Sequence, residues 1–337
     1  MKKTNFIILG ILLIAGLSFL FFKTKESDTT LKVSTSFFQL KDTASITKLF
    51  TADLNGNQVL LERKNFYWTV NGKYRADRNS INNFFEPLTR MYIKAPVSDK
   101  HRDELIMEMT VGHRKVEVYR NGEKERTYYI GNATADGLGT YVFSDDENLD
   151  RPYIVHIPGW NGNLAPRFFT DELSWRSKKV FNTAPVKIEY LKVDYVNTPE
   201  HSYKVTYNSD GAAQLFDGAG KPSDAADALK IKEALMATNK LYFEDFLPKI
   251  SAAGVDSVVN ILPLHATISI KIAGKDETKA LLKVYDKHTD RKGVEGAVPI
   301  DRYYVYFEGG DRSRMGLLQK GMGSKLLKKF DRFELSK

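Results

Sequence analysis

The first feature of the chain is an unbroken apolar run near its start. Residues 6–22 carry no charge, and thirteen of these seventeen residues are Leu, Ile or Phe. At about −0.3 to −0.6 kcal/mol each, they favour insertion into a bilayer by roughly 4–8 kcal/mol. A helix of this length spans about 25 Å, and flanking lysines can extend it across the ~30 Å hydrocarbon core. The pattern predicts a transmembrane signal anchor over residues 6–22, after a cytoplasmic stub of residues 1–5.

The flanking charges predict the orientation of this anchor. Lys2 and Lys3 precede the run, and Lys23 and Lys25 follow it. Because the N-terminal stub is short, we expect it inside and the body on the periplasmic side of the cytoplasmic membrane, in a single pass. A cleavable signal peptide is the competing interpretation, although the run ends in Phe-Leu-Phe-Phe where such peptides carry small residues. A buried core helix is a third alternative.

After a polar linker over residues 23–30, short alternating segments predict strands. They are expected at 45–50, 58–62, 66–70, 107–111, 115–119, 127–130, 140–143, 153–157, 186–193, 202–207, 213–216, 266–272, 279–285 and 303–307. Asn71-Gly72 and Asn121-Gly122 are typical of tight hairpin turns. Helical spacing predicts helices at 80–92, with Ser80 as N-cap and a kink at Pro87, and at 223–238.

The two halves of the body repeat this order of elements. The matched positions are Ile46 with Ile188, Leu49 with Leu191, Ile81, Phe84 and Leu88 with Ala228, Ile231 and Leu235, Val118 with Val284, and Val142 with Val305. The pattern predicts an α+β fold with two duplicated units, over residues 31–181 and 182–337. Each unit is expected to hold an antiparallel sheet with one or two packed helices. Chance similarity between α+β segments is the alternative.

The composition of the chain excludes or disfavours several kinds of functional site. The chain has no cysteine, which excludes disulfides, thiolate metal sites and cysteine nucleophiles. The net charge of +8 does not form the broad basic stripe of a nucleic-acid-binding protein. The six histidines are scattered, and the acidic loop at 145–150 lacks the spacing of a calcium loop. We therefore expect no cofactor, no metal site and no recognisable catalytic residues, so an enzyme is the less favoured class.

Two segments are candidate contact surfaces. Residues 158–175 hold Trp160, Asn161, Arg167 and Trp175, and aromatic and arginine side chains in irregular segments are common in recognition surfaces. The alternative for this segment is a loop that its rings pin to the core. Residues 322–333 have helical spacing of apolar residues and predict a solvated helix packed by its apolar edge, with contact between its basic side and anionic lipid headgroups as the alternative. The basic residues are Lys325, Lys328, Lys329 and Arg332.

Three segments together carry a resemblance to a known family. They are residues 138–181, the strand end from Trp68 to Gly72, and the Phe84 to Leu88 helix segment with its Phe-Phe-x-Pro-Leu pattern. The chain resembles the bacterial domain-of-unknown-function family 4340. The resemblance implies an N-terminal membrane anchor and repeated α+β units, and no established activity. Relatives of this family are associated with auxiliary components of ABC-type transport systems.

These observations predict a membrane-anchored, extracytoplasmic binding or assembly module. A protein partner in the cell envelope is expected, within a transport or surface machinery. The alternatives are an envelope hydrolase with an unrecognised carboxylate site and a glycan- or peptide-binding module.

The anchor generates the first prediction. The full-length chain should pellet with membranes and stay there in alkaline carbonate, because the apolar run is held by hydrocarbon. Alkaline phosphatase fused to the C-terminus should be active outside the cytoplasm. Recovery of the intact chain in the cytosolic fraction would contradict this prediction.

Overall fold

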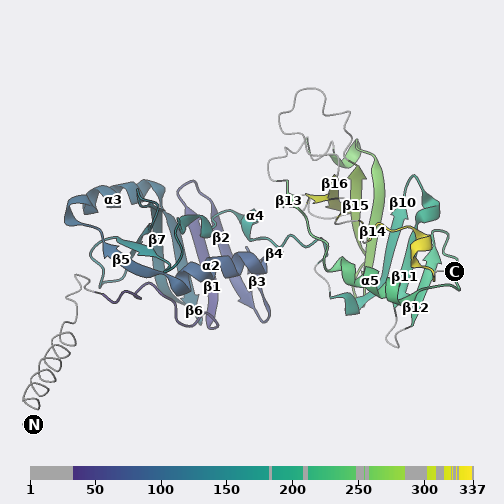
Figure 1. Ribbon diagram of the computed structural model, residues 1–337, viewed down its shortest axis with the longest axis horizontal. Helices are drawn as coiled ribbons and strands as arrows, with labels where there is room; N and C mark the ends of the chain where they lie inside the picture. Colours follow the sequence, from purple (N-terminus) through teal and green to yellow (C-terminus); the bar gives the residue numbers. More distant parts are fainter. Residues whose placement is uncertain are drawn as a thin grey trace, which may run out of the picture. The chain divides into compact units, whose positions relative to one another are not determined.

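The computed structural model describes most of the body of the chain. The described residues are 33–181, 184–207, 212–247, 258–284, 302–308, 315–319 and 326–335, with 254, 321 and 324. Within this part of the chain, no helix is long and apolar enough to cross a membrane. The predicted anchor over 6–22 lies outside the described residues. The chain divides into two compact units, Met1–Arg176 and Ser177–Lys337 (Figure 1).

The first unit is built on a nine-stranded antiparallel sheet of order β4-β3-β2-β1-β6-β7-β8-β9-β5. The bounds are β1 Ile46–Asp53, β2 Gln58–Lys64, β3 Tyr67–Val70, β4 Tyr74–Arg75, β5 Tyr92–Pro96, β6 Arg114–Arg120, β7 Glu123–Ala133, β8 Thr140–Ser144 and β9 Tyr153–His156. The predicted turn dipeptides lie between β3 and β4 and between β6 and β7. Their asparagines have φ values of 50° and 51°, as a tight turn of this kind needs.

Helices cover both faces of this sheet. Helix α2 (Arg78–Arg90) joins the larger core, which also contains Tyr128 and Ile130 of β7. Helix α3 (Asp99–Gly112) packs against Tyr129 of the same strand. Because successive residues of a strand point to opposite faces, α2 and α3 lie on opposite sides of the sheet. Two short helices follow, η1 (Ala165–Arg167) and α4 (Glu172–Trp175).

The second unit has an eight-stranded antiparallel sheet of order β12-β11-β10-β14-β15-β16-β17-β13. The bounds are β10 Ile188–Tyr195, β11 Tyr203–Tyr207, β12 Ala213–Asp217, β13 Asp245–Phe246, β14 Leu264–Ile272, β15 Thr278–Val284, β16 Arg302–Phe307 and β17 Gly316–Gln319. Helix α5 (Ala228–Thr238) buries Ile231, Ala234 and Leu235. The short helices are η2 (Pro185–Lys187), η3 (Pro199–His201) and η6 (Phe330–Phe333).

The two units share one topology. The first sheet has one additional edge strand, β4. Without it, the two sheets have the same strand order, in which β1, β2 and β3 correspond to β10, β11 and β12, β5 corresponds to β13, and β6 to β9 correspond to β14 to β17. Both first strands carry a register irregularity at the same place, after Ile46 in β1 and after Ile188 in β10. The fold is therefore α+β with two antiparallel sheets of matching order.

The helix that follows the third strand starts in the same way in both units. The carboxylate of Asp77 accepts the amides of the second and third residues after it, and Asp227 does the same. An N-cap of this kind satisfies amides that the first helical turn leaves open. Ser80 is therefore not the N-cap of α2, and the second helix begins at Ala228 and not at residue 223.

The strand registers correct part of the predicted repeat alignment. Leu49 lies opposite Val118, and its counterpart Leu191 lies opposite Ile270, so Val118 corresponds to Ile270 and not to Val284. The N-caps align Ile81 with Ile231, one turn later than the predicted match with Ala228. The errors arise because apolar periodicity repeats within each strand and helix, so that periodicity alone cannot fix the register.

Two predicted elements are wrong. Residues 107–111 were expected as a strand because apolar and polar residues alternate there, but they belong to α3, where Leu105 and Met109 are buried one turn apart. Residues 322–333 were expected as one helix, yet among the described residues only Phe330–Phe333 is helical, as the short η6. Pro87 lies inside α2, which continues to Arg90.

A matched pair of aromatic side chains ends the two units. The backbone amide of Asp77 donates to the carbonyl of Trp175 at 2.7 Å, and that of Asp227 donates to Phe333 at 2.8 Å. Both rings are fully buried. Each closing segment therefore places one large ring over the core, beside the start of the helix.

Truncation of one of these rings should destabilise its own unit. Trp175→Ala should lower the free energy of unfolding of the first unit by about 3–5 kcal/mol, because a buried aromatic ring leaves a cavity. Urea titration with peptide-resolved hydrogen exchange measures the loss in each unit. Trp160→Ala, at a half-buried position, is the control and should cost clearly less. Equal losses for the two variants would contradict the assignment of Trp175 to the core.

Candidate functional site

The structure places Trp175 in the core. Its ring packs against Phe84 at 5.1 Å and Phe169 at 5.4 Å between centroids, and its indole N–H donates to the carbonyl of Phe169 at 3.1 Å. A ring in this position cannot contact a ligand on the surface. This part of the predicted recognition surface is therefore better described by the alternative, a loop that its rings pin to the core.

The other predicted recognition residues remain closer to solvent. Arg167 lies 5.0 Å from the centroid of the Trp160 ring, and its guanidinium also pairs with the carboxylate of Glu86 on α2. The hydrogen bond from Arg167 is the main reason why the pKa of Glu86 lies below its usual range. Asn161 is exposed. Trp160 and Arg167 thus tie the segment to α2, and only Asn161 is freely presented.

The predicted lipid-contact residues lie in the segment that ends the second unit. Lys325 is outside the described residues. Lys328 is half-buried, with its Nζ 5.8 Å from the centroid of the Phe333 ring, while Lys329 and Arg332 are exposed. Since Leu326 and Phe333 are buried, this segment packs on the unit through its apolar side chains, and two of the described basic residues face solvent.

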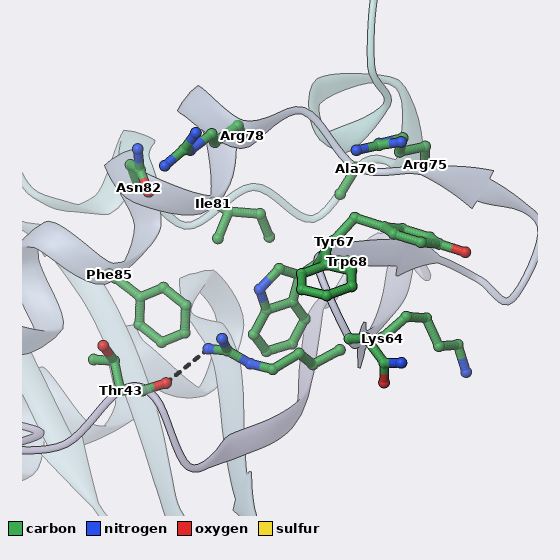
Figure 2. Close-up of a pocket in the computed structure, with 13 residues that line it drawn as sticks. Thr43, Lys64, Tyr67, Trp68, Arg75, Ala76, Arg78, Ile81, Asn82 and Phe85 are labelled. Carbon is green, nitrogen blue, oxygen red and sulfur yellow. Dashed lines mark hydrogen bonds between the residues drawn. The ribbon is translucent and has the colours of Figure 1, made fainter. Parts of the chain in front are cut away.

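The most distinctive hollow of the described surface is a pocket in the first unit, between the β2–β3 hairpin and α2. Its volume is about 480 Å³. We name it the basic-aromatic pocket. Its lining contains four cationic residues and no carboxylate, and it comprises Thr43, Arg63, Lys64, Asn65, Phe66, Tyr67, Trp68, Arg75, Ala76, Arg78, Ile81, Asn82 and Phe85. Figure 2 shows Arg78, Ile81 and Asn82 on the helix, across Trp68 from Lys64 on the hairpin.

Arg63 is the structural cation of this pocket. Its guanidinium donates to the carbonyls of Ile46 and Thr43, both at 2.7 Å, and lies 4.6 Å from the centroid of the Trp68 ring. Burial lowers its pKa, and the nearby Asp42 partly opposes that shift. Trp68 in turn lies 5.9 Å from the Phe85 ring of α2. This stack fixes the hairpin against the helix and forms the floor of the pocket.

The remaining cations are available to a ligand. Arg75 lies 4.7 Å from the centroid of the Tyr67 ring and forms no ion pair with a described carboxylate. Arg78, at the first position of α2, is exposed, and its side chain makes no hydrogen bond or ion pair within the described part of the chain. Lys64 has only a half-exposed pairing with Glu62 at 3.7 Å, which contributes little. An anion would therefore find cations whose charge is not already neutralised.

The pocket cations stand beside exposed rings. Phe66 is 94% exposed and Tyr67 is 41% exposed. Guanidinium groups bind carboxylates and phosphates with two parallel hydrogen bonds, and aromatic rings provide flat apolar surface next to them. The arrangement can hold an anionic group that is joined to an apolar body.

The described residues offer little for acid–base or metal chemistry. No group of three or more His, Asp or Glu side chains among them could hold a metal ion. A general acid that works near neutral pH needs a raised pKa, whereas eight of the described carboxyl groups have a lowered pKa. These groups are Asp42, Asp53, Glu86, Glu117, Asp136, Asp146, Asp227 and Glu244.

Comparison with known proteins identifies the family. The sequence pattern of a family described as a domain of unknown function (DUF4340) matches residues 68–258. The chain belongs to this family. The DUF4340 match begins in β3 of the first unit and ends within the second, so it takes in α2 and α5. No curated protein and no solved structure matches the chain.

Sequence reasoning missed the basic-aromatic pocket. Its cations come from β2, β4 and α2, and no compact motif joins them. One available signal was the Lys64-Asn65-Phe66-Tyr67 turn, which places two large rings where a hairpin turn is usually polar. The predicted DUF4340 resemblance is confirmed, but a family of unknown function assigns no site residues.

The two kinds of arginine in the pocket should respond differently to substitution. Arg63→Ala should lower the free energy of unfolding by about 1.5–3 kcal/mol, since it removes two charge-assisted hydrogen bonds. Arg78→Ala should change it by no more than about 0.5 kcal/mol. Urea unfolding followed by peptide-resolved hydrogen exchange compares them. A loss for Arg78→Ala as large as that for Arg63→Ala would contradict this division of roles.

Proposed function

We propose that the chain is a membrane-tethered, extracytoplasmic binding module that holds an anionic component of the cell envelope in the basic-aromatic pocket. The observation that carries this proposal is a pocket lined by four cationic residues without a carboxylate. Three of these cations, Lys64, Arg75 and Arg78, are exposed. The tether rests on the apolar run of residues 6–22. We further propose that the two units arose by duplication of one ancestor, which the shared strand order supports.

The composition of the pocket lining favours binding over the hydrolase alternative. The pocket itself holds cations and rings, which bind and orient an anion but do not supply a proton-donating carboxyl group. The aromatic rings of the pocket would also suit a glycan or a peptide. A glycan- or peptide-binding module is therefore a variant of the same proposal, provided that the ligand is anionic.

A protein partner in the envelope stays part of the proposal. The resemblance suggested an accessory role in an ABC-type transport or surface machinery, and an acidic segment of such a partner is one possible occupant of the pocket. The chemistry of the pocket requires only that the occupant be anionic.

Purification of the tagged full-length chain in mild detergent tests this function. Arg75→Glu combined with Arg78→Glu should remove most of the protein or anionic lipid that co-purifies with the wild type. Lys221→Glu combined with Lys275→Glu is the matched control, since it changes the net charge by the same amount at exposed positions of the second unit that belong to no candidate contact surface. If the pocket pair and the control pair lower the recovery of each co-purifying component equally, the result would contradict a binding role for the pocket. If neither pair lowers the recovery of any component, the result would contradict it as well.

A further inference from the structure

We propose that the occupant of the basic-aromatic pocket is the phosphate headgroup of an anionic membrane phospholipid, with Phe66 entering the bilayer interface beside it. This inference rests on the proposed function, because the tether brings the pocket to the membrane. It names the ligand class and adds a second contact between the chain and the bilayer.

The second unit shows that the fold does not need these side chains. The register pairs Trp68 with Arg63 in the first unit and Ala213 with Tyr207, the β11 equivalent of Arg63, in the second. Trp68 therefore corresponds to Ala213. By the shared N-cap, Arg75 and Arg78 correspond to Ala225 and Ala228. Three buried positions of the helix stay apolar in both units, namely Ile81 and Ile231, Phe84 and Ala234, and Pro87 and Ala237, whereas the positions matched to Trp68, Arg75 and Arg78 are alanine in the second unit. Arg75 and Arg78, unlike the structural pair Arg63 and Trp68, therefore serve something other than folding.

The second observation is the exposure of Phe66. Lys64 and Tyr67 form the last pair of the β2–β3 ladder, so Asn65 and Phe66 make the turn itself. A phenyl ring that is 94% exposed at the tip of a hairpin contributes almost no packing to the unit. Rings next to basic residues are typical of the membrane interface, where the ring enters the headgroup region and the cations meet lipid phosphates.

The strands beneath the pocket favour a headgroup over an acidic peptide. β2 lies between β1 and β3, and β3 lies between β2 and β4, so their backbone groups are already paired. The edge strand β4 has only two residues. An added peptide strand would find few free backbone partners there, whereas a phosphate needs only side-chain donors.

The predicted tether allows this contact. Nine residues lie between Lys23 and the first described residue, Val33, so the chain between these two residues reaches at most about 35 Å. The tether therefore keeps the first unit near the headgroups at high effective concentration, so weak individual contacts suffice. Two signals, an anchor and a basic patch, commonly act together in this way.

The chain offers a direct probe because it contains no cysteine. Phe66→Cys in the full-length chain can be labelled at one site with an apolar, environment-sensitive fluorophore. The labelled chain is then reconstituted into vesicles of phosphatidylcholine alone or of phosphatidylcholine with phosphatidylglycerol. Leu229→Cys, at an exposed position of α5, carries the control label.

We expect a blue shift of the label at position 66 in vesicles with phosphatidylglycerol, and none in phosphatidylcholine alone. The shift should disappear with Arg75→Glu and Arg78→Glu and persist with Lys221→Glu and Lys275→Glu. No shift in anionic vesicles, or an equal loss with both pairs, would overturn the inference.

The outcome is separable from that of the proposed function. If the reconstituted chain is extracted by alkaline carbonate, the tether itself fails. If it stays in the bilayer without a shift at position 66, while a co-purifying protein is lost with the pocket pair, then the binding function stands and the lipid ligand is wrong.

Discussion

The structure depends on covering the apolar face of each antiparallel sheet. A sheet of this size exposes a broad hydrophobic face that must be buried, and one helix covers it only in part. In both units a returning segment completes the cover with a large ring, Trp175 or Phe333. The backbone amide of the helix-capping aspartate donates to the carbonyl of that same ring residue. One hydrogen bond therefore joins the start of the helix to the end of the unit.

This construction leaves the rim between the second strand, the third strand and the helix free to vary. The core positions Ile81 and Ile231 have the same role in the two units, and so have the capping aspartates. The rim of the first unit instead carries Trp68, Arg75 and Arg78, and the second unit carries alanine at the three positions matched to them. Differences confined to a rim, over a shared core, are what a binding site added to a scaffold produces.

Much of the fold could be predicted from the sequence, because alternation, turn dipeptides and helical spacing are local signals. Asn121-Gly122 and the strands around it illustrate this. Helix α3 was missed since its residues 107–111 alternate like a strand, and packing against β7 decided otherwise. The pocket was missed for another reason: Arg63, Arg75 and Arg78 come together only through strand pairing and the placement of α2. Trp175 was assigned to a surface because sequence does not distinguish a buried ring from an exposed one in an irregular segment.

The central claim is that the first unit carries a binding surface that the second lacks. Hydrogen exchange on the full-length chain, in neutral and in anionic bilayers, tests it most directly. The account predicts slower exchange at residues 64–67 and 75–78 in anionic bilayers only, with no change at residues 225–228, which are equivalent to 75–78. Exchange that is unaltered at the first set, or slowed alike in both units, would contradict it.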